Sequence, residues 1–241
     1  DWDAVASQFA VDEDDVRVDT LPQPSCNIAP TQNIGVVAQG KDGRRHLTGA
    51  YWSLVPRWSA SKVLSYPTYN ARVESAHVKP AFTESTKSMR AIIPLPATTN
   101  GKVAGRSIFT RHMMNYVFGR PVLMVEAVSR IAMQLTATII TCPAADEFVK
   151  VHDRMPLLAP RNMVASWLDR SVDGAALLDS MREAGTMLSR RLQFHEVAPL
   201  NSDGKRLIQP LDSTEPMRLF ELLQLEPAMQ LYMKTDQSTP R

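Results

Sequence analysis

Short β-rich segments separated by turn residues constrain the fold of this chain more than any other feature. They lie at residues 34–38, 45–51, 91–94, 122–125, 135–141 and 191–198. The first two flank Gly40-Lys-Asp-Gly43, which predicts a hairpin turn. Many short strands with few helical patterns indicate an α+β fold, with a curved antiparallel sheet or open barrel and flanking helices.

Helical spacing marks the remaining elements. Trp2, Val5, Ala6 and Phe9 recur with the period of an amphipathic helix. We expect further helices over 160–168, 173–189 and 217–225, and an extended connection through the acidic run 12–19. The predicted organisation is a single domain over residues 1–212, followed by a tail, 213–241, that contains a short helix.

Composition excludes several classes of protein. Two cysteines among 241 residues, Cys26 and Cys142, make a disulfide framework unexpected and fit a reducing compartment. No apolar run approaches the roughly 20 residues that cross a bilayer. Five dispersed histidines without a Cys-x-x-Cys or His-Glu-x-x-His pattern predict no metal and no cofactor. We therefore expect a cytoplasmic monomer without membrane partners.

Charge is distributed unevenly along the chain. Residues 1–20 carry seven acids against one base, although the whole chain has a net charge of only +2. Residues 57–120 carry ten bases against two acids, a local net charge of +8. Such an excess is typical of solvated surface charge, and also of a groove that follows nucleic-acid phosphates.

Three motifs combine polar groups with rigid neighbours. They are Tyr51-Trp-Ser-Leu-Val-Pro-Arg-Trp58, Asn70-Ala-Arg-Val-Glu74 and Val151-His-Asp-Arg-Met-Pro156. Asn27-Ile-Ala-Pro-Thr-Gln32 precedes them, and Leu207-Ile-Gln-Pro-Leu211 follows. None is decisive alone, and their order and spacing are more specific than any one motif.

The polar residues of these motifs suit reaction chemistry, although each could also have an ordinary structural role. The Asn70 carboxamide can orient a carbonyl or sugar, and the Arg72 fork suits bidentate phosphate contact. Alternatively, Asn70 is a turn residue and Arg72 pairs with Glu74. His152 can move protons near neutrality, or is an ordinary surface histidine.

The aromatic residues are equally open to two interpretations. Trp52 and Trp58 can be core residues, or can form a surface on which nucleobases stack. We expect Trp52 to be buried and Trp58 to lie near nucleic acid. Pro30 could form a rigid edge against an unstacked base.

Together the motifs resemble the SRAP family (SOS response-associated peptidase), which recognises abasic sites in single-stranded DNA. The resemblance covers residues 1–212, with a poorly matching stretch near 97–134. It implies that Asn70 orients the sugar and that His152 manages protons. The residues implied to bind DNA are Arg72, Arg57, Trp58, Pro30 and Arg154.

The resemblance also implies a reaction. In the family an N-terminal cysteine reacts with the abasic aldehyde to give a DNA–protein cross-link, and the peptidase activity is self-processing. This chain begins at Asp1, so we expect the cysteine to precede it. Asn100 stands where the family has a catalytic Glu, and an amide cannot exchange a proton at pH 7.

The implied setting is DNA damage repair in the SOS response, in the cytoplasm and with the nucleoid if the source is bacterial. Two alternatives remain. One is a catalytically weakened homologue that only binds single-stranded or damaged DNA. The other is a thiol hydrolase that uses Cys142 and His152.

Overall fold

The computed structural model describes residues 2–23, 25, 27–61, 64–94, 97–103, 106–112, 122–131, 134–190 and 192–197. The expected tail, with its helix over 217–225, lies outside these residues and stays a prediction, as does the boundary at residue 212. None of the helices within the described ranges has the length and apolar character to cross a membrane.

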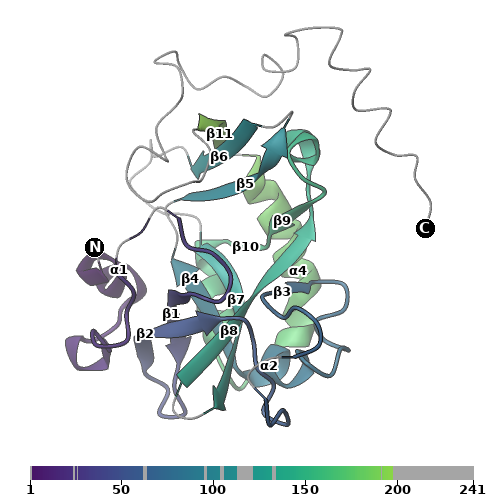
Figure 1. Cartoon of the computed structure of the whole chain (residues 1–241). Coiled ribbons are helices and arrows are strands. Elements are labelled where there is room, and N and C mark those ends of the chain that lie inside the picture. Colours follow the sequence, from purple (N-terminus) through teal and green to yellow (C-terminus); the bar gives the residue numbers. More distant parts are fainter. Residues whose placement is uncertain are drawn as a thin grey trace, which may run out of the picture.

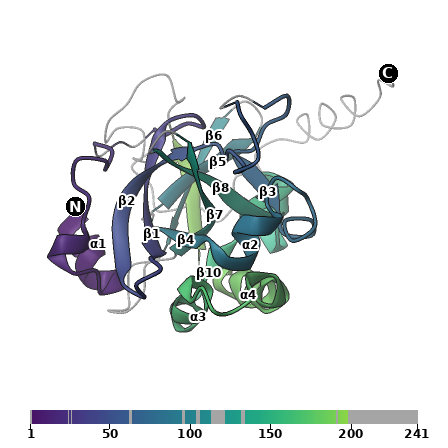
Figure 2. The ribbon, with the colours of Figure 1, turned by 90° about the horizontal axis from the view of Figure 1, so that it is seen from below.

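A curled sheet of eight strands forms the body of the molecule (Figures 1 and 2). Its strands are β1 (Asn33–Gln39), β2 (Arg45–Trp52), β3 (Asn70–Arg72), β4 (Arg90–Pro94), β7 (Val122–Ile131), β8 (Gln134–Pro143), β9 (Arg154–Pro156) and β10 (Leu158–Ala159). The pairing order is β10-β7-β4-β1-β2-β8-β3, β9 pairs with β8, and β7 pairs with β8 as well as β4. The sheet therefore curls back on itself, which confirms the expected fold class, and it is mixed because β8 runs parallel to β2 and β3.

The hairpin of β1 and β2 confirms the turn predicted at Gly40–Gly43. The Gly40 amide donates to the Arg44 carbonyl at 2.8 Å, and Gly43 adopts a φ of 80°, which favours glycine. The central residues of β1 are buried on both faces because helix α1 (Trp2–Phe9) covers the outer one. A Cβ on Gly35 would lie 2.3 Å from the Trp2 ring, so the glycine permits this close packing.

Helices α2 (Thr83–Ser88), α3 (Val164–Leu168) and α4 (Gly174–Ser189) pack beside the sheet (Figure 2). The expected helix over 160–168 is present, with a 3-10 turn (Arg161–Met163) before α3, and the helix expected over 173–189 is α4. The Asp173 side chain caps α4 by accepting from the Ala175 amide at 2.9 Å. A Cβ on Gly185 would lie 2.6 Å from the Leu158 carbonyl oxygen, so this glycine lets α4 approach β10.

The acidic connection differs from the expected extended segment. It contains a 3-10 turn (Glu13–Asp15), and Val16 then forms a parallel bridge with Leu47 of β2. The turn brings the buried Asp15 carboxylate to 2.8 Å from the Arg44 guanidinium and 3.3 Å from His46 Nδ1. These ion pairs, together with the bridge to Leu47, hold the segment against the hairpin.

A second sheet of three strands has the order β11-β6-β5. It comprises β5 (Ala97–Val103), β6 (Arg106–His112) and β11 (Leu192–Val197). The strand expected over 191–198 is therefore present, whereas the hairpin of β5 and β6 was not predicted. Its two strands are rich in Thr and charged residues, so they lack the apolar alternation that identifies strands.

One cation of the basic 57–120 region is structural. Arg90 is only 2% exposed, and its guanidinium donates to the carbonyl oxygens of Thr86, Lys87, Trp167 and Asp169, at the ends of α2 and α3. It also stacks over the Trp167 ring, 5.2 Å from the centroid. Burial lowers the pKa of Arg90. Arg90 therefore joins two helices to β4 and is not available to DNA.

Candidate functional site

Three short stretches of backbone place the predicted polar residues on one face. Asn70 and Arg72 of β3, and Arg154 of β9, lie opposite Ile139, Thr141 and Pro143 of β8. Cross-strand partners project from the same face of a sheet, and alternate residues of one strand do so too. The register therefore brings Asn70, Arg72 and Arg154 to a common face, the β3–β8–β9 face.

The backbone before Asn70 is held from two sides. The Tyr69 carbonyl oxygen accepts from the Ile139 amide at 2.9 Å and from Trp52 Nε1 at 2.8 Å. Asn70 itself is exposed, and within the described ranges its side chain has no hydrogen-bond partner. Its carboxamide is thus free to bind a ligand while its backbone stays fixed.

Trp52 also holds the loop that carries Pro30. The Trp52 amide donates to the Gln32 carbonyl, and the Thr31 amide donates to the Trp52 carbonyl, both at 2.8 Å. The Gln32 side chain accepts from the Ala29 amide at 2.9 Å. Trp52 is half-buried rather than buried as expected, and it connects the Pro30 loop to the backbone before Asn70.

The two arginines of this face differ in their surroundings. Arg154 makes a bidentate pair with Glu74, at 2.8 and 2.9 Å, and its Nη2 donates to the Thr141 carbonyl at 2.6 Å. This hydrogen bonding from Arg154 lowers the pKa of Glu74. Arg72 is exposed and has no ion pair among the residues that the structure describes. The geometry makes Arg154 a brace across β8 and leaves Arg72 as the accessible cation.

His152 precedes β9 and is exposed, as a proton shuttle requires. Its Nδ1 lies 2.7 Å from Asp153 Oδ1 and 2.9 Å from the Arg154 amide nitrogen. A ring nitrogen cannot donate and accept at once, so the two contacts belong to different protonation or tautomeric states. A ring without a hydrogen on Nδ1 accepts from the Arg154 amide, whereas a ring with a hydrogen on Nδ1, neutral or protonated, donates to Asp153. Nδ1 therefore has a partner in either state.

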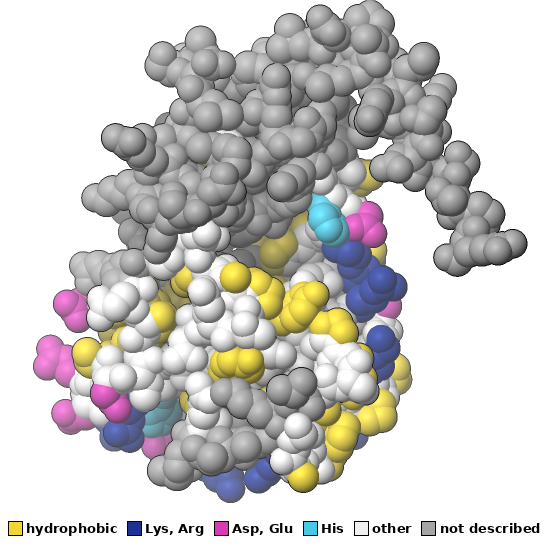
Figure 3. Space-filling model, in the orientation of Figure 1, with side chains coloured by type: hydrophobic (Ala, Val, Ile, Leu, Met, Phe, Trp, Pro, Cys, Tyr) yellow, Lys and Arg dark blue, Asp and Glu magenta, His cyan; other side chains and the backbone are white. Residues whose placement is uncertain are grey.

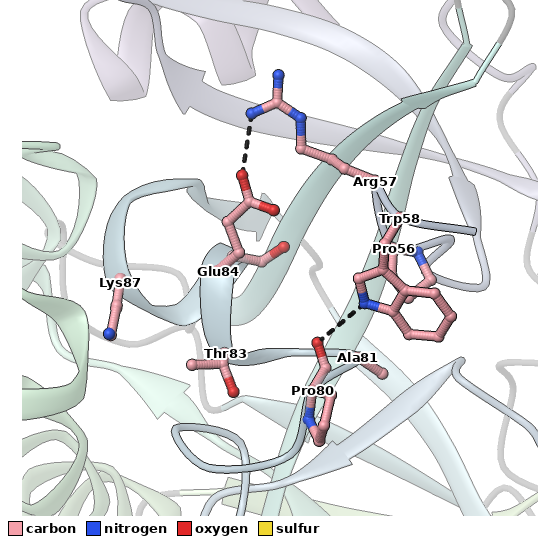
Figure 4. A pocket seen from close by; sticks show the side chains of 9 residues that line it. Pro56, Arg57, Trp58, Pro80, Ala81, Thr83, Glu84 and Lys87 are labelled. Atoms are coloured by element: carbon pink, nitrogen blue, oxygen red, sulfur yellow. Dashed lines mark hydrogen bonds and ion pairs between the residues drawn. The ribbon is translucent and has the colours of Figure 1, made fainter. Parts of the chain in front are cut away.

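Arg57 and Trp58 lie in the loop after β2, beside the segment that leads into α2 (Figure 4). Arg57 Nη1 donates to Glu84 Oε1 at 3.0 Å, and Trp58 Nε1 donates to the Pro80 carbonyl at 3.4 Å. Trp58 is 60% exposed, so it is a surface aromatic residue rather than a core one. These residues line a pocket of about 290 Å³.

Cys142 does not suit the thiol-hydrolase alternative. It is buried in β8 opposite Met155, between residues that project from the β3–β8–β9 face, so its side chain points the other way. Burial raises the pKa of its thiol to about 11, which leaves almost no thiolate at neutral pH. The structure therefore argues against Cys142 as a nucleophile. Cys26 lies outside the described residues.

Asn100 lies in β5, with Ile108 as its backbone partner and a register shift between Asn100 and Lys102. It belongs to the three-stranded sheet rather than to the eight-stranded sheet that contains β3 and β9. Its place at the family's Glu position stays a prediction. No group of His, Cys, Asp and Glu side chains in the described ranges is arranged to hold a metal ion.

Sequence reasoning missed Glu74 as the partner of Arg154, Glu84 as the partner of Arg57, and Trp52 as a support for Asn70. Glu74 lies two residues after Arg72, a spacing that could have placed it on the same side of an extended segment. The other two pairings depend on loops packing together. Figure 3 shows Lys and Arg side chains along the flank where β3 and β9 lie, and acidic ones around α1.

The chain is similar in sequence to one family model and to several known proteins. The family model "SOS response associated peptidase (SRAP)" matches residues 1–200. The chain is 30% identical over 175 residues to abasic site processing protein YoaM of Bacillus subtilis (strain 168), covering 70% of this chain and 75% of that protein. It is 24% identical over 210 residues to abasic site processing protein YedK of Escherichia coli (strain K12), covering 83% and 90%.

Solved structures share the fold. A crystal structure of a protein from Bordetella bronchiseptica superposes with a TM-score of 0.60 at 19% identity, covering 83% of this chain and 96% of that chain. A protein from Bacteroides thetaiotaomicron superposes with a TM-score of 0.58 at 15% identity, covering 76% and 82%. At these identities the likeness concerns the fold alone.

Proposed function

Because this chain belongs to the SRAP (SOS response associated peptidase) family, we propose that it recognises abasic sites in single-stranded DNA and cross-links to them covalently. Relatives named abasic site processing proteins support the class of substrate. The observation that carries the proposal is the β3–β8–β9 face, where Asn70 and Arg72 are exposed on a backbone fixed by β8 and Trp52. An amide for the sugar thus lies beside a cation for the phosphate.

The proposed reaction uses the open aldehyde form of the abasic sugar. An N-terminal amine adds to the aldehyde, and the resulting carbinolamine loses water to give an imine. The neighbouring cysteine thiol then adds to the imine carbon and its proton passes to nitrogen, which closes a thiazolidine ring. The net change is the loss of one water. This cysteine is the N-terminal residue that the resemblance implies.

His152 is the proposed proton carrier. Water can leave the carbinolamine only after its hydroxyl gains a proton, and the amine must lose one. The exposed ring can hold that proton against Asp153 and can lose it while accepting from the Arg154 amide. In the proposed complex Arg72 binds a phosphate, and Trp58 and Pro30 hold flanking nucleotides. Arg57 uses only Nη1 toward Glu84, so its other donors can bind a phosphate, whereas Arg154 uses both Nη atoms and contributes if DNA displaces Glu74.

The second candidate is a DNA-binding module with weakened chemistry. Asn100 favours it, because an amide at the expected Glu position cannot exchange protons. Loss of a general acid–base group typically slows a reaction by about 10² to 10⁴-fold.

The test is to incubate the full-length protein with a single-stranded oligonucleotide that contains one abasic site. Cross-linking predicts a band that survives denaturing electrophoresis without reductant, and Asn100→Glu should increase its rate of formation. A protein that binds the oligonucleotide but gives no stable band, with Asn100 or with Glu in its place, would leave the binding module as the function.

A further inference from the structure

The pocket beside Trp58 has the features of a site for one flat ring. The loop that carries Pro56, Arg57 and Trp58 forms one side, and Pro80, Glu84 and Lys87 contribute to the other (Figure 4). Its volume of about 290 Å³ is at the lower limit of ligand pockets. Such a pocket fits a single small ring system rather than a longer ligand.

The pocket wall is apolar and fixed. Trp58 exposes 60% of its surface, yet its Nε1 donates to the Pro80 carbonyl, which ties the indole to the facing segment. Pro56 and Pro80 restrict the backbone on either side. An exposed indole held in place offers a surface on which an aromatic ring can stack without ordering the side chain first.

Glu84 places a hydrogen-bond acceptor at one edge of the pocket. Glu84 Oε1 accepts from Arg57 Nη1, whereas Oε2 has no hydrogen-bond partner in the part of the chain that the structure describes. A carboxylate accepts hydrogen bonds and does not donate them. At Glu84 Oε2, a ring that presents an amino group is therefore favoured over one that presents a carbonyl oxygen.

Cations border the same pocket. Arg57 and Lys87 both line it and both are exposed. The Arg57–Glu84 pair is 63% and 53% exposed at its side chains, so it is weak and a phosphate can compete for the guanidinium. The pocket therefore has an indole for stacking, a carboxylate acceptor and two cations at its margin. This combination suits a nucleotide whose base enters the pocket while its phosphates remain at the rim.

We propose that the Trp58 pocket receives one unstacked base of bound single-stranded DNA, and that Glu84 makes it prefer bases with an exocyclic amino group. This proposal rests on the proposed DNA-binding function and adds a sequence preference to it. Cytosine presents an amino group where thymine presents a carbonyl oxygen, and carboxylates accept from the cytosine N4 amine. The pocket should therefore prefer cytosine to thymine.

The experiment compares the dissociation constants of the full-length protein for undamaged oligo-dC and oligo-dT of equal length. Wild-type protein should bind oligo-dC about three- to tenfold more tightly, below the full discrimination of a buried contact because Glu84 is half-exposed. Glu84→Gln should abolish the ratio, since an amide can also donate to thymine. Glu183→Gln is the matched control, because it removes the same charge from an exposed position on α4 and should leave the ratio unchanged. Trp58→Ala should weaken binding to both oligonucleotides by about fivefold or more, and Trp58→Phe should restore most of it.

The outcomes separate this proposal from the function on which it rests. Equal affinity of the wild type for both oligonucleotides, or a preference that survives Glu84→Gln, would overturn the base preference while leaving DNA binding intact. No binding to either undamaged oligonucleotide would overturn this assignment, whereas the proposed function is overturned separately, by failure to bind or cross-link the abasic oligonucleotide.

Discussion

Replacing Trp52 by Phe should slow the abasic-site reaction without weakening DNA binding. The substitution keeps an aromatic ring but removes the N–H that donates to the Tyr69 carbonyl at 2.8 Å. A hydrogen bond of this kind contributes about 0.5–1.5 kcal/mol net. The Tyr69 carbonyl retains the Ile139 amide as a donor, so no acceptor is left without a partner and the lower half of that range applies.

The expected effect on the rate of adduct formation follows from the free energy of this lost hydrogen bond. If the lost free energy, about 1 kcal/mol or less, is expressed as poorer placement of Asn70 in the transition state, the rate of adduct formation falls by about two- to fivefold. Single-turnover adduct formation at saturating protein measures this rate. Fluorescence anisotropy with undamaged single-stranded DNA should give an unchanged dissociation constant.

Trp167→Phe is the matched control. Trp167 Nε1 donates to the Ala91 carbonyl at 3.1 Å in the core, and its ring stacks on Arg90, so it makes none of the hydrogen bonds that hold the Tyr69 carbonyl. Because Trp167 is fully buried, this variant should lose more stability than Trp52→Phe and yet keep the wild-type reaction rate. If Trp52→Phe reacts at the wild-type rate, or if both variants slow in proportion to their lost stability, the positioning role is refuted.

Three further predictions concern single residues. Arg72→Ala should weaken binding to all single-stranded sequences alike and reduce the dependence of affinity on salt, measured by titration at several salt concentrations; an unchanged salt slope would contradict a phosphate contact. His152→Ala should slow adduct formation and leave the affinity for undamaged DNA nearly unchanged, and a joint loss of folding and binding would instead make His152 structural. The pKa of Glu74 is lowered by Arg154, so the ionised form stabilises the folded state above its ordinary pKa of about 4.5, and this contribution is lost as the pH falls through the folded-state value. Melting temperatures from pH 7 to pH 3 should therefore show a small advantage of wild type over Glu74→Gln that disappears in acid, and an advantage that grows in acid would have the wrong sign.

Local patterns in the sequence predicted those elements that are defined by their own residues. The β1–β2 hairpin follows from the turn at Gly40–Gly43, and α4 follows from the helical spacing over 173–189. Strands β3, β9 and β10 have two or three residues each, too few to show a period. They are strands because β8 and β7 pair with them, which no local pattern records.

In the candidate site, too, local motifs indicated individual residues but not the contacts between distant parts of the chain. The motifs identified Asn70, Arg72 and His152 as candidates, and their roles in the reaction stay predictions. The motifs do not indicate which charged side chains form ion pairs with one another in the folded protein. Arg154 meets Glu74 across 80 residues of sequence, and Arg57 meets Glu84 across 27. Arg90 and Arg72 are the same residue type, yet burial makes the first a structural cation and exposure leaves the second free.

Intact mass spectrometry of the adduct tests the central claim most directly. For the full-length protein with a single-stranded abasic oligonucleotide, a thiazolidine predicts a mass equal to the two components minus one water, unchanged by borohydride. A mass that gains two hydrogens on borohydride treatment would indicate an imine and would contradict ring closure by a thiol. The absence of any covalent species, from a protein shown to bind the same oligonucleotide, would contradict the cross-linking function itself.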